Sequence, residues 1–230
     1  MKFSHPFLFS SLLAVFFSSG AIPVANSAAN NAQDPIKLPE PIYDGKTSVE
    51  KALQKRRSIR QYKNLPITIQ DLSQLLWAAQ GISGTGGRRT APSAGALYPL
   101  ELYVVAGNVT GLSVGLYSYD PHKHELSRIL DSDKRAELSK TALGQSSIKN
   151  AAAVLVISAV YERVTIKYGE RGIQYVHMEA GHAAQNLFLQ AVSLDLGTVV
   201  IGAFHDEQVR AVLHLPGQVQ PLYLMPMGKK

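Results

Sequence analysis

A short apolar run near the middle of the chain places the strongest limit on its fold. Residues 153–158, Ala-Val-Leu-Val-Ile-Ser, are continuous and nearly all apolar, which is the pattern of a strand buried on both faces. Further strands are expected at 101–105, 115–119, 125–129, 198–201 and 222–225, and the Asp120-Pro121 pair predicts a hairpin between the second and the third of these.

Helical patterns separate these strands. A helix is expected from about Ser48 to Arg57, with Ser48 as its N-cap. A second should run from Thr68 to Gly81, and others are expected at 134–143, 175–194 and 206–213. Because strands and helices alternate without a strict βαβ repeat, the predicted fold class is α+β, with a mostly antiparallel central sheet flanked by helices.

The first 29 residues are predicted to be a secretory signal peptide. Lys2 precedes an apolar stretch at 7–17, and small residues follow as far as Ala29. The stretch is shorter than the roughly 20 residues of a membrane span, although an uncleaved anchor is the alternative. An exported protein, periplasmic or extracellular and without a stable span after cleavage, is therefore expected.

The exported chain is predicted to have two parts. Residues 30–46 contain Pro35, Pro39 and Pro41 and are expected to form an extended arm without regular structure. Residues 47–230 should form one domain, since a chain of 230 residues that is 46% hydrophobic can build one sizeable core.

Composition excludes several kinds of site. The chain has no cysteine, so thiol nucleophiles, disulfides and Cys-ligated metals are absent. No metal site is expected, because His177 and His182 are separated on a helix by about 500° of rotation. No G-x-S-x-G elbow supports a hydrolase. Nucleic-acid binding is not expected either, since the net charge of +6 comes without a recognisable module.

A basic block follows the first expected helix. Arg56, Arg57, Ser58 and Arg60 bring three guanidinium groups and a hydroxyl group within five residues. Guanidinium groups bind phosphate oxygens in a bidentate way, so the block can hold a phosphorylated cofactor. The alternative, on these residues alone, is a solvated basic helix end.

The long expected helix carries small residues at Ala180, Gly181, Ala183 and Ala184. Small side chains allow close approach of another backbone, from a neighbouring helix or from a second subunit. Packing in the core of one chain explains them equally well.

Four blocks in a fixed order resemble the nitroreductase superfamily. They are the R-x-S-x-R block at 56–60, P-S-A-G-A-L-Y-P at 92–99, E-A-G-H-A-A-Q-N at 179–186 and Ile201-Gly202. The Leu38–Pro41 lead-in and the K-Y-G-E-R-G run at 167–172 resemble its SagB/ThcOx-type branch of FMN-dependent dehydrogenases in particular. The resemblance extends from about residue 36 to the end of the chain.

The resemblance implies a homodimer that holds FMN at the subunit interface. Arg56, Arg57 and Ser58 would hold the phosphate and ribityl chain, and Arg60 would face the N1/O2 edge of the flavin. The partner subunit would lay Pro92, Ser93, Ala94 and Gly95 beside the flavin ring. The backbone at Ile201-Gly202 would lie near N5 and O4, Gln145 would contact the ribityl chain or ring, and Lys229 would complete the phosphate site.

The resemblance also implies a reaction. Lys167 and Tyr168 match a pair that removes a substrate proton while hydride passes to FMN, although Lys167 could instead be an ordinary surface lysine. We therefore expect an FMN-dependent oxidoreductase that acts by a ping-pong mechanism on a small organic substrate or NAD(P)H. The alternative function is a non-catalytic flavin- or anion-binding protein on the same scaffold.

Overall fold

The computed structural model describes residues 1–2 and 34–230. The predicted signal peptide, apart from Met1 and Lys2, and residues 30–33 of the predicted arm lie outside the described residues. Within the described part of the chain, no helix is both long enough and apolar enough to span a membrane.

A seven-stranded sheet forms the centre of the folded domain. Its strands lie in the order β1-β6-β5-β3-β7-β9-β8, and every neighbouring pair is antiparallel, which confirms the predicted class. A small parallel pair, β2 with β4, is separate from it. The strands are β1 (Ile36–Lys37), β2 (Ile67–Thr68), β3 (Leu100–Ala106), β4 (Val109–Thr110), β5 (Gly115–Asp120), β6 (Glu125–Leu130), β7 (Ala153–Val160), β8 (Leu196–Thr198) and β9 (Val219–Lys229).

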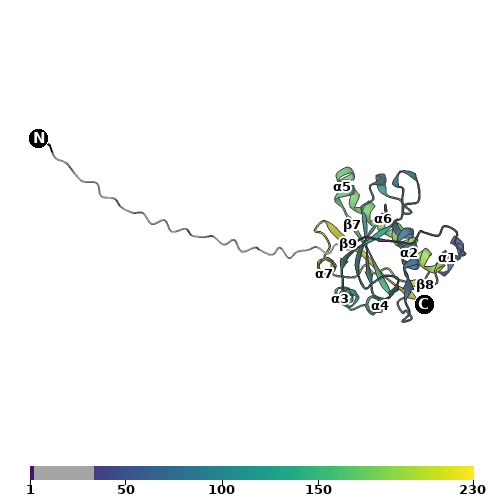
Figure 1. Cartoon of the computed structure of the whole chain (residues 1–230). Helices are drawn as coiled ribbons and strands as arrows, with labels where there is room; N and C mark the ends of the chain where they lie inside the picture. Colours follow the sequence, from purple (N-terminus) through teal and green to yellow (C-terminus); the bar gives the residue numbers. More distant parts are fainter. Residues whose placement is uncertain (3–33) are drawn as a thin grey trace. The chain divides into compact units, whose positions relative to one another are not determined.

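Helices cover both faces of this sheet (Figure 1). On one face α2 and α6 pack over Leu155 and Ile157 of β7. On the other face α3, α4 and α7 pack over Val154 and Val156. The helices are α1 (Val49–Lys55), α2 (Ile69–Gln80), α3 (Arg135–Thr141), α4 (Ser146–Lys149), α5 (Glu162–Tyr168), α6 (Arg171–Ser193) and α7 (Asp206–Val212).

The two helix starts that the sequence marked most clearly are confirmed. The Ser48 side chain accepts a hydrogen bond from the Lys51 amide at 3.2 Å and caps α1. Thr68 and Asp71 form a reciprocal capping box at the start of α2, with both bonds 3.0 Å long. The helix ends at Gly81, as expected.

Several expected boundaries were wrong. The strand expected at 198–201 is β8 at Leu196–Thr198, and Ile201 makes only an isolated bridge to Leu224. The last strand is eleven residues long rather than four, because β9 pairs with β7 and then with β8. The longest helix begins at Arg171, and the short helices α4 and α5 were not predicted.

The described part of the arm is fastened to the domain. Residues 36–37 pair with β6, although the prolines around them predicted no regular structure. The Pro39 carbonyl oxygen accepts a hydrogen bond of 2.5 Å from the Ser73 hydroxyl group. His124 is buried and lies 2.7 Å from Ser73 Oγ through Nε2 and 2.8 Å from the Tyr119 hydroxyl group through Nδ1. This network holds the arm against α2 and the β5–β6 hairpin.

The network predicts a pH-dependent contribution to stability. Burial lowers the pKa of His124, against opposing effects of the Pro39 carbonyl and Glu40. A lowered histidine pKa gives stability that is present above the unfolded value of about 6.5 and lost as pH falls below it. We expect His124→Asn to cost about 1–2 kcal/mol of unfolding free energy at pH 7.5 and less at pH 5.5, measured by urea unfolding.

Asparagine suits the left-handed backbone of His124, whose φ is 54°. His122→Asn is the matched control, because His122 is exposed and lies on the same turn. A His124→Asn cost that is equal at both pH values would contradict the prediction.

Candidate functional site

The basic block is held in an extended segment along the edge of the sheet. After α1 ends, the Ile59 amide donates a hydrogen bond to the Thr198 carbonyl at 2.9 Å, and the Lys63 amide donates one to Lys229 at 2.8 Å. The Tyr62 hydroxyl group bonds the carbonyls of Ile59 and Pro226, at 2.9 and 3.0 Å. The sheet therefore fixes the backbone that carries the arginines.

The arginines of this block keep their charges available. Arg57, Ser58 and Arg60 are exposed, and Arg56 lies over the Phe188 ring with its guanidinium carbon 5.1 Å from the centroid. None of the three arginines forms an ion pair with a carboxylate among the described residues. Three guanidinium groups without an acidic partner form a surface suited to an anion.

The two C-terminal lysines are both paired in the structure. Lys229 Nζ lies 3.1 Å from Asp71 Oδ2, and Lys230 Nζ lies 2.9 Å from Asp195 Oδ1. Lys229 is part of β9 and is half-buried. Its backbone is therefore in place beside the basic block, but its ammonium group already has a partner.

A second group of predicted residues gathers on the Pro92–Gly95 loop. Gly95 has a φ of 62°, and a β-carbon added there would lie 2.7 Å from the Tyr168 hydroxyl oxygen and 3.0 Å from Lys167 Nζ. The structure thus brings the predicted catalytic pair directly over the loop that was expected to contact the flavin. Tyr168 also packs edge-on against Tyr175, with ring centroids 5.2 Å apart, which fixes its ring at the start of α6.

A third group joins Gln145 to the segment after β8. Gln145 Nε2 donates a hydrogen bond to the Ala203 carbonyl at 3.3 Å, one residue beyond Gly202. Ile201 is buried and exchanges two backbone bonds with Leu224, each 2.9 Å long, whereas Gly202 is exposed. A cavity of about 360 Å³ adjoins Gly202, and its lining includes Tyr161, His177 and Asp206.

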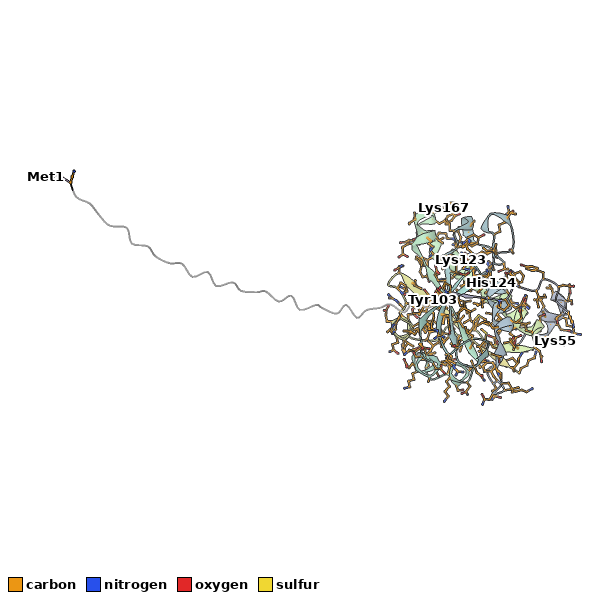
Figure 2. All side chains as sticks on the ribbon, viewed as in Figure 1. Met1, Lys55, Tyr103, Lys123, His124 and Lys167 are labelled. Atoms are coloured by element: carbon orange, nitrogen blue, oxygen red, sulfur yellow. The ribbon has the colours of Figure 1, made fainter. Side chains whose placement is uncertain are left out.

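The first two groups lie on different sides of the domain. Figure 2 shows Lys55, the residue before Arg56, well away from Lys167 on α5. Helix α6 connects the two regions, since its Phe188 packs against Arg56 and its Asn186 side chain bonds the Thr90 carbonyl at 3.3 Å. A cavity of about 490 Å³ lies beside α1, α2 and α6, with Ala52, Thr90 and Asn186 in its lining.

Sequence reasoning missed several residues near these groups. Tyr161 and His177 form a hydrogen bond of 2.6 Å at the cavity of about 360 Å³ beside Gly202. Glu179 is only 3% exposed, and beside it Arg89 lies over the Tyr98 ring at 4.6 Å. The sequence signal that could have marked Glu179 is its position on a helix among the small residues Ala180, Gly181 and Ala183.

The described residues contain one Ser–His pair but no candidate metal cluster. No cluster of three metal-ligating side chains occurs within residues 34–230. Ser73 and His124 do come together as a Ser–His pair, which no local motif had indicated. Ser73 is fully buried and the third member is the Tyr119 hydroxyl group, so this pair anchors the arm and offers no accessible nucleophile.

Comparison with known proteins assigns the family. The Nitroreductase family matches residues 53–229. The chain belongs to the nitroreductase family. A Methanocaldococcus jannaschii protein with the provisional name nitroreductase MJ1384 is 50% identical over 182 residues, which cover 79% of this chain and 91% of that protein. The chain is thus a member of an oxidoreductase family.

Other relatives agree with the branch and the fold. The microcin B17-processing protein McbC of Escherichia coli is 27% identical over 70% of this chain and 62% of its own length. A provisionally named nitroreductase from Ralstonia eutropha superposes with a TM-score of 0.76 at 30% identity, covering 88% of this chain and 92% of that one. An NADPH:FMN oxidoreductase from Vibrio harveyi superposes with a TM-score of 0.57 at 25% identity, over 79% and 68% of the two chains.

The contact between Gly95 and the Lys167–Tyr168 pair can be tested by substitution. Gly95→Ala should lower the free energy of unfolding through both backbone strain and displacement of the two side chains. Gly86→Ala is the matched control, because Gly86 has a φ of 73° with no atom within 4 Å of an added β-carbon. We expect urea unfolding to give about 1 kcal/mol for Gly86→Ala and more for Gly95→Ala. Equal costs would show that Lys167 and Tyr168 do not rest on Gly95.

Proposed function

We propose that this protein is an FMN-dependent oxidoreductase of the SagB/ThcOx type, which transfers hydride between a small organic substrate or NAD(P)H and an acceptor by a ping-pong mechanism. The observation that carries the proposal is the contact of Lys167 and Tyr168 with the Pro92–Gly95 loop. It brings a basic and a phenolic group together on the loop that, by resemblance to the family, would lie beside the flavin.

The basic block fits the phosphate of the cofactor. Arg56, Arg57 and Ser58 present guanidinium and hydroxyl donors at an exposed segment whose backbone is held by β8 and β9. The three arginines of the block lack carboxylate partners among the described residues, so binding a phosphate there breaks no existing ion pair. A dianionic phosphate would neutralise part of the block's charge.

The other residues would hold the rest of the cofactor. Arg60 would present positive charge to the N1/O2 edge of the ring, and Gln145 and the Ile201-Gly202 backbone would contact the ribityl chain and the N5 edge. The bond between Gln145 and Ala203 keeps these two segments together. Lys229 would have to leave Asp71 to reach a phosphate, so in our proposal it contributes mainly charge.

Bound FMN supplies the hydride acceptor and donor. The chain's own task in a dehydrogenation is to remove the substrate proton, and we assign it to Lys167 Nζ together with the Tyr168 hydroxyl group. Lys167 lies over the Tyr168 ring, with Nζ 5.3 Å from its centroid, so the two groups face the same space. Lys167 and Tyr168 would take the proton of the substrate's X–H bond while the hydride of the adjacent C–H bond is lost, so that a C=X double bond forms in the product.

We further propose that the protein acts as a homodimer after export. The separation of the basic block from the Lys167 region on one chain supports a site to which two copies contribute (Figure 2). The signal-like start of the sequence supports export, and the protein would then acquire FMN outside the cytoplasm.

Flavin binding is the first test of this proposal. Protein purified with added FMN should show stoichiometric flavin absorbance between about 350 and 500 nm. The Arg56→Ala/Ser58→Ala variant should lose it, because two phosphate donors are removed. Lys55→Ala is the control, since it removes one positive charge from the adjacent helix end without touching the block. A wild-type protein that stays colourless would refute the proposal, and equal loss in the Lys55→Ala variant would reduce the block to general electrostatics.

The role of the Lys167–Tyr168 pair is tested separately. The branch members whose Lys-Tyr pair Lys167 and Tyr168 resemble include azoline-oxidising enzymes, so a small azoline is the test substrate. Lys167→Met and Tyr168→Phe should keep FMN but slow its oxidation by about 100-fold or more, the usual contribution of a general base. Arg171→Gln, at a neighbouring exposed position, should leave the rate unchanged. Stopped-flow reduction of the flavin measures the step directly. If both variants react at the wild-type rate, simple nitro or quinone reduction is the better description.

A further inference from the structure

A buried carboxyl group lies behind the loop that carries Gly95, and the proposed chemistry does not use it. Glu179 belongs to α6 and is 3% exposed, although glutamate is rarely so deeply buried without a partner. Its Oε1 atom has no hydrogen-bond partner among the described residues. A buried group of this kind needs a physical reason to be retained.

The neighbours of Glu179 come from the end of α2 and from the loop. Gln80 is 1% exposed, and its Oε1 accepts a hydrogen bond of 2.8 Å from Arg89. Gln80 Nε2 and Arg89 Nε are buried and without partners among the described residues, like Glu179 Oε1. Ser93 is the third neighbour, because α6 packs against the short turn that follows Ser93 and the Ser93 hydroxyl group lowers the pKa of Glu179. We refer to these four residues as the Glu179 cluster.

Ser93 is the fixed point of the turn that displays Gly95. Its hydroxyl oxygen accepts a hydrogen bond from the Tyr98 amide at 2.9 Å, and its carbonyl oxygen accepts one from Ala96 at 3.1 Å. Within this turn, Gly95, Ala96 and Tyr98 all have positive φ, at 62°, 54° and 46°. Two of these residues are not glycine, so the turn is strained and must be held by its surroundings.

We propose that Glu179 is a positioning residue whose buried carboxyl group holds Ser93, and through Ser93 the strained turn on which Lys167 and Tyr168 rest. Its importance for flavin chemistry rests on the proposed function, but its effect on the turn does not. An ionised carboxylate accepts the Ser93 hydroxyl hydrogen, which leaves the Ser93 oxygen free to accept from Tyr98. A protonated carboxyl group can itself donate to the Ser93 oxygen, so the direction of the bond that would hold Ser93 depends on the protonation state of Glu179.

Both forms of the group are accessible near neutral pH. Burial raises the pKa of Glu179 to about 7, against the opposing effects of Ser93, Arg89 and Gln80. The Arg89 guanidinium group faces Glu179. Its charge also interacts with Glu101 and is opposed by Arg163, and the Tyr98 ring lies beneath it. The protonation state of Glu179 thus changes near pH 7.

Linkage gives the sign of the effect on stability. A carboxyl group whose folded pKa is raised contributes stability at pH values below its unfolded pKa of about 4.5, and this is lost as pH rises through about 7. The unfolding equilibrium constant should therefore rise by up to about tenfold per pH unit between these values because of this one group. Glu179→Gln keeps the shape and removes the titration, so this part of the slope should disappear.

The experiment compares the full-length apoprotein with its Glu179→Gln variant. Glu125→Gln on β6 is the control, because the Glu125 side chain has no hydrogen-bond or ion-pair partner among the described residues. Urea unfolding between pH 5 and 8.5 measures the slope, and amide hydrogen exchange measures the turn. We expect the flattened slope only in Glu179→Gln. At pH 8 the amides of Ala96 and Tyr98 should exchange a few-fold to about tenfold faster in that variant, with β7 amides unchanged.

Ser93→Ala provides the second arm and covers the case in which Glu179→Gln does not fold. It should accelerate exchange at Tyr98 in the same way, and in the double variant no further acceleration should follow. Unchanged exchange at Ala96 and Tyr98 in the substituted proteins, or an unchanged pH slope in Glu179→Gln, would overturn the inference. An FMN fluorescence titration distinguishes the two proposals: a wild-type protein that binds no FMN refutes the proposed function, whereas the exchange and unfolding results stand independently.

Discussion

The burial of β7 on both faces is the constraint on which the rest of the structure depends. All eight residues of Ala153–Val160 are buried, and the strand pairs along its length with β3 and β9. Leu155 and Ile157 point to one apolar layer, whereas Val154 and Val156 point to the other. A strand with two apolar faces requires cover on both sides, which is why helices flank the sheet in two layers.

Helix α6 converts this scaffold into a site. Its buried stripe, which includes Ala180, Ala183 and Leu187, packs on the sheet, so the helix is held rigidly along its length. Its other contacts reach outward, from Glu179 at the loop to Phe188 beneath Arg56. These two residues are nine positions apart, or about 13 Å along the helix axis. Within one chain, one rigid element thereby sets the distance between the proposed phosphate-binding block and the loop that the chain would contribute to its partner's flavin site.

Local patterns predicted the fold well where local chemistry decides it. The Thr68 and Asp71 capping box and the buried run at 153–158 acted as expected, because hydrogen bonding and burial there are properties of neighbouring residues. Strand ends were predicted poorly: β9 is long because β7 and β8 supply partners far away in sequence, and no local signal contains that information. The basic block and the ordered motifs indicated the site residues that we propose. The meeting of Lys167 with Gly95 and the burial of Glu179 required the tertiary structure.

The position of β9 has a consequence for the order in which the molecule is assembled. This strand lies between β7 and β8, so the sheet stays divided until residues near the end of the sequence have paired. The segment that carries Arg56–Arg60 packs against Thr198 and Lys229. It is synthesised before these residues and can take its final position only after they have formed β8 and β9. Such long-range pairing is slow compared with helix formation. Anion affinity should therefore emerge as the final event of folding, and a chain that crosses a membrane unfolded would have no competent cofactor site until its passage is complete.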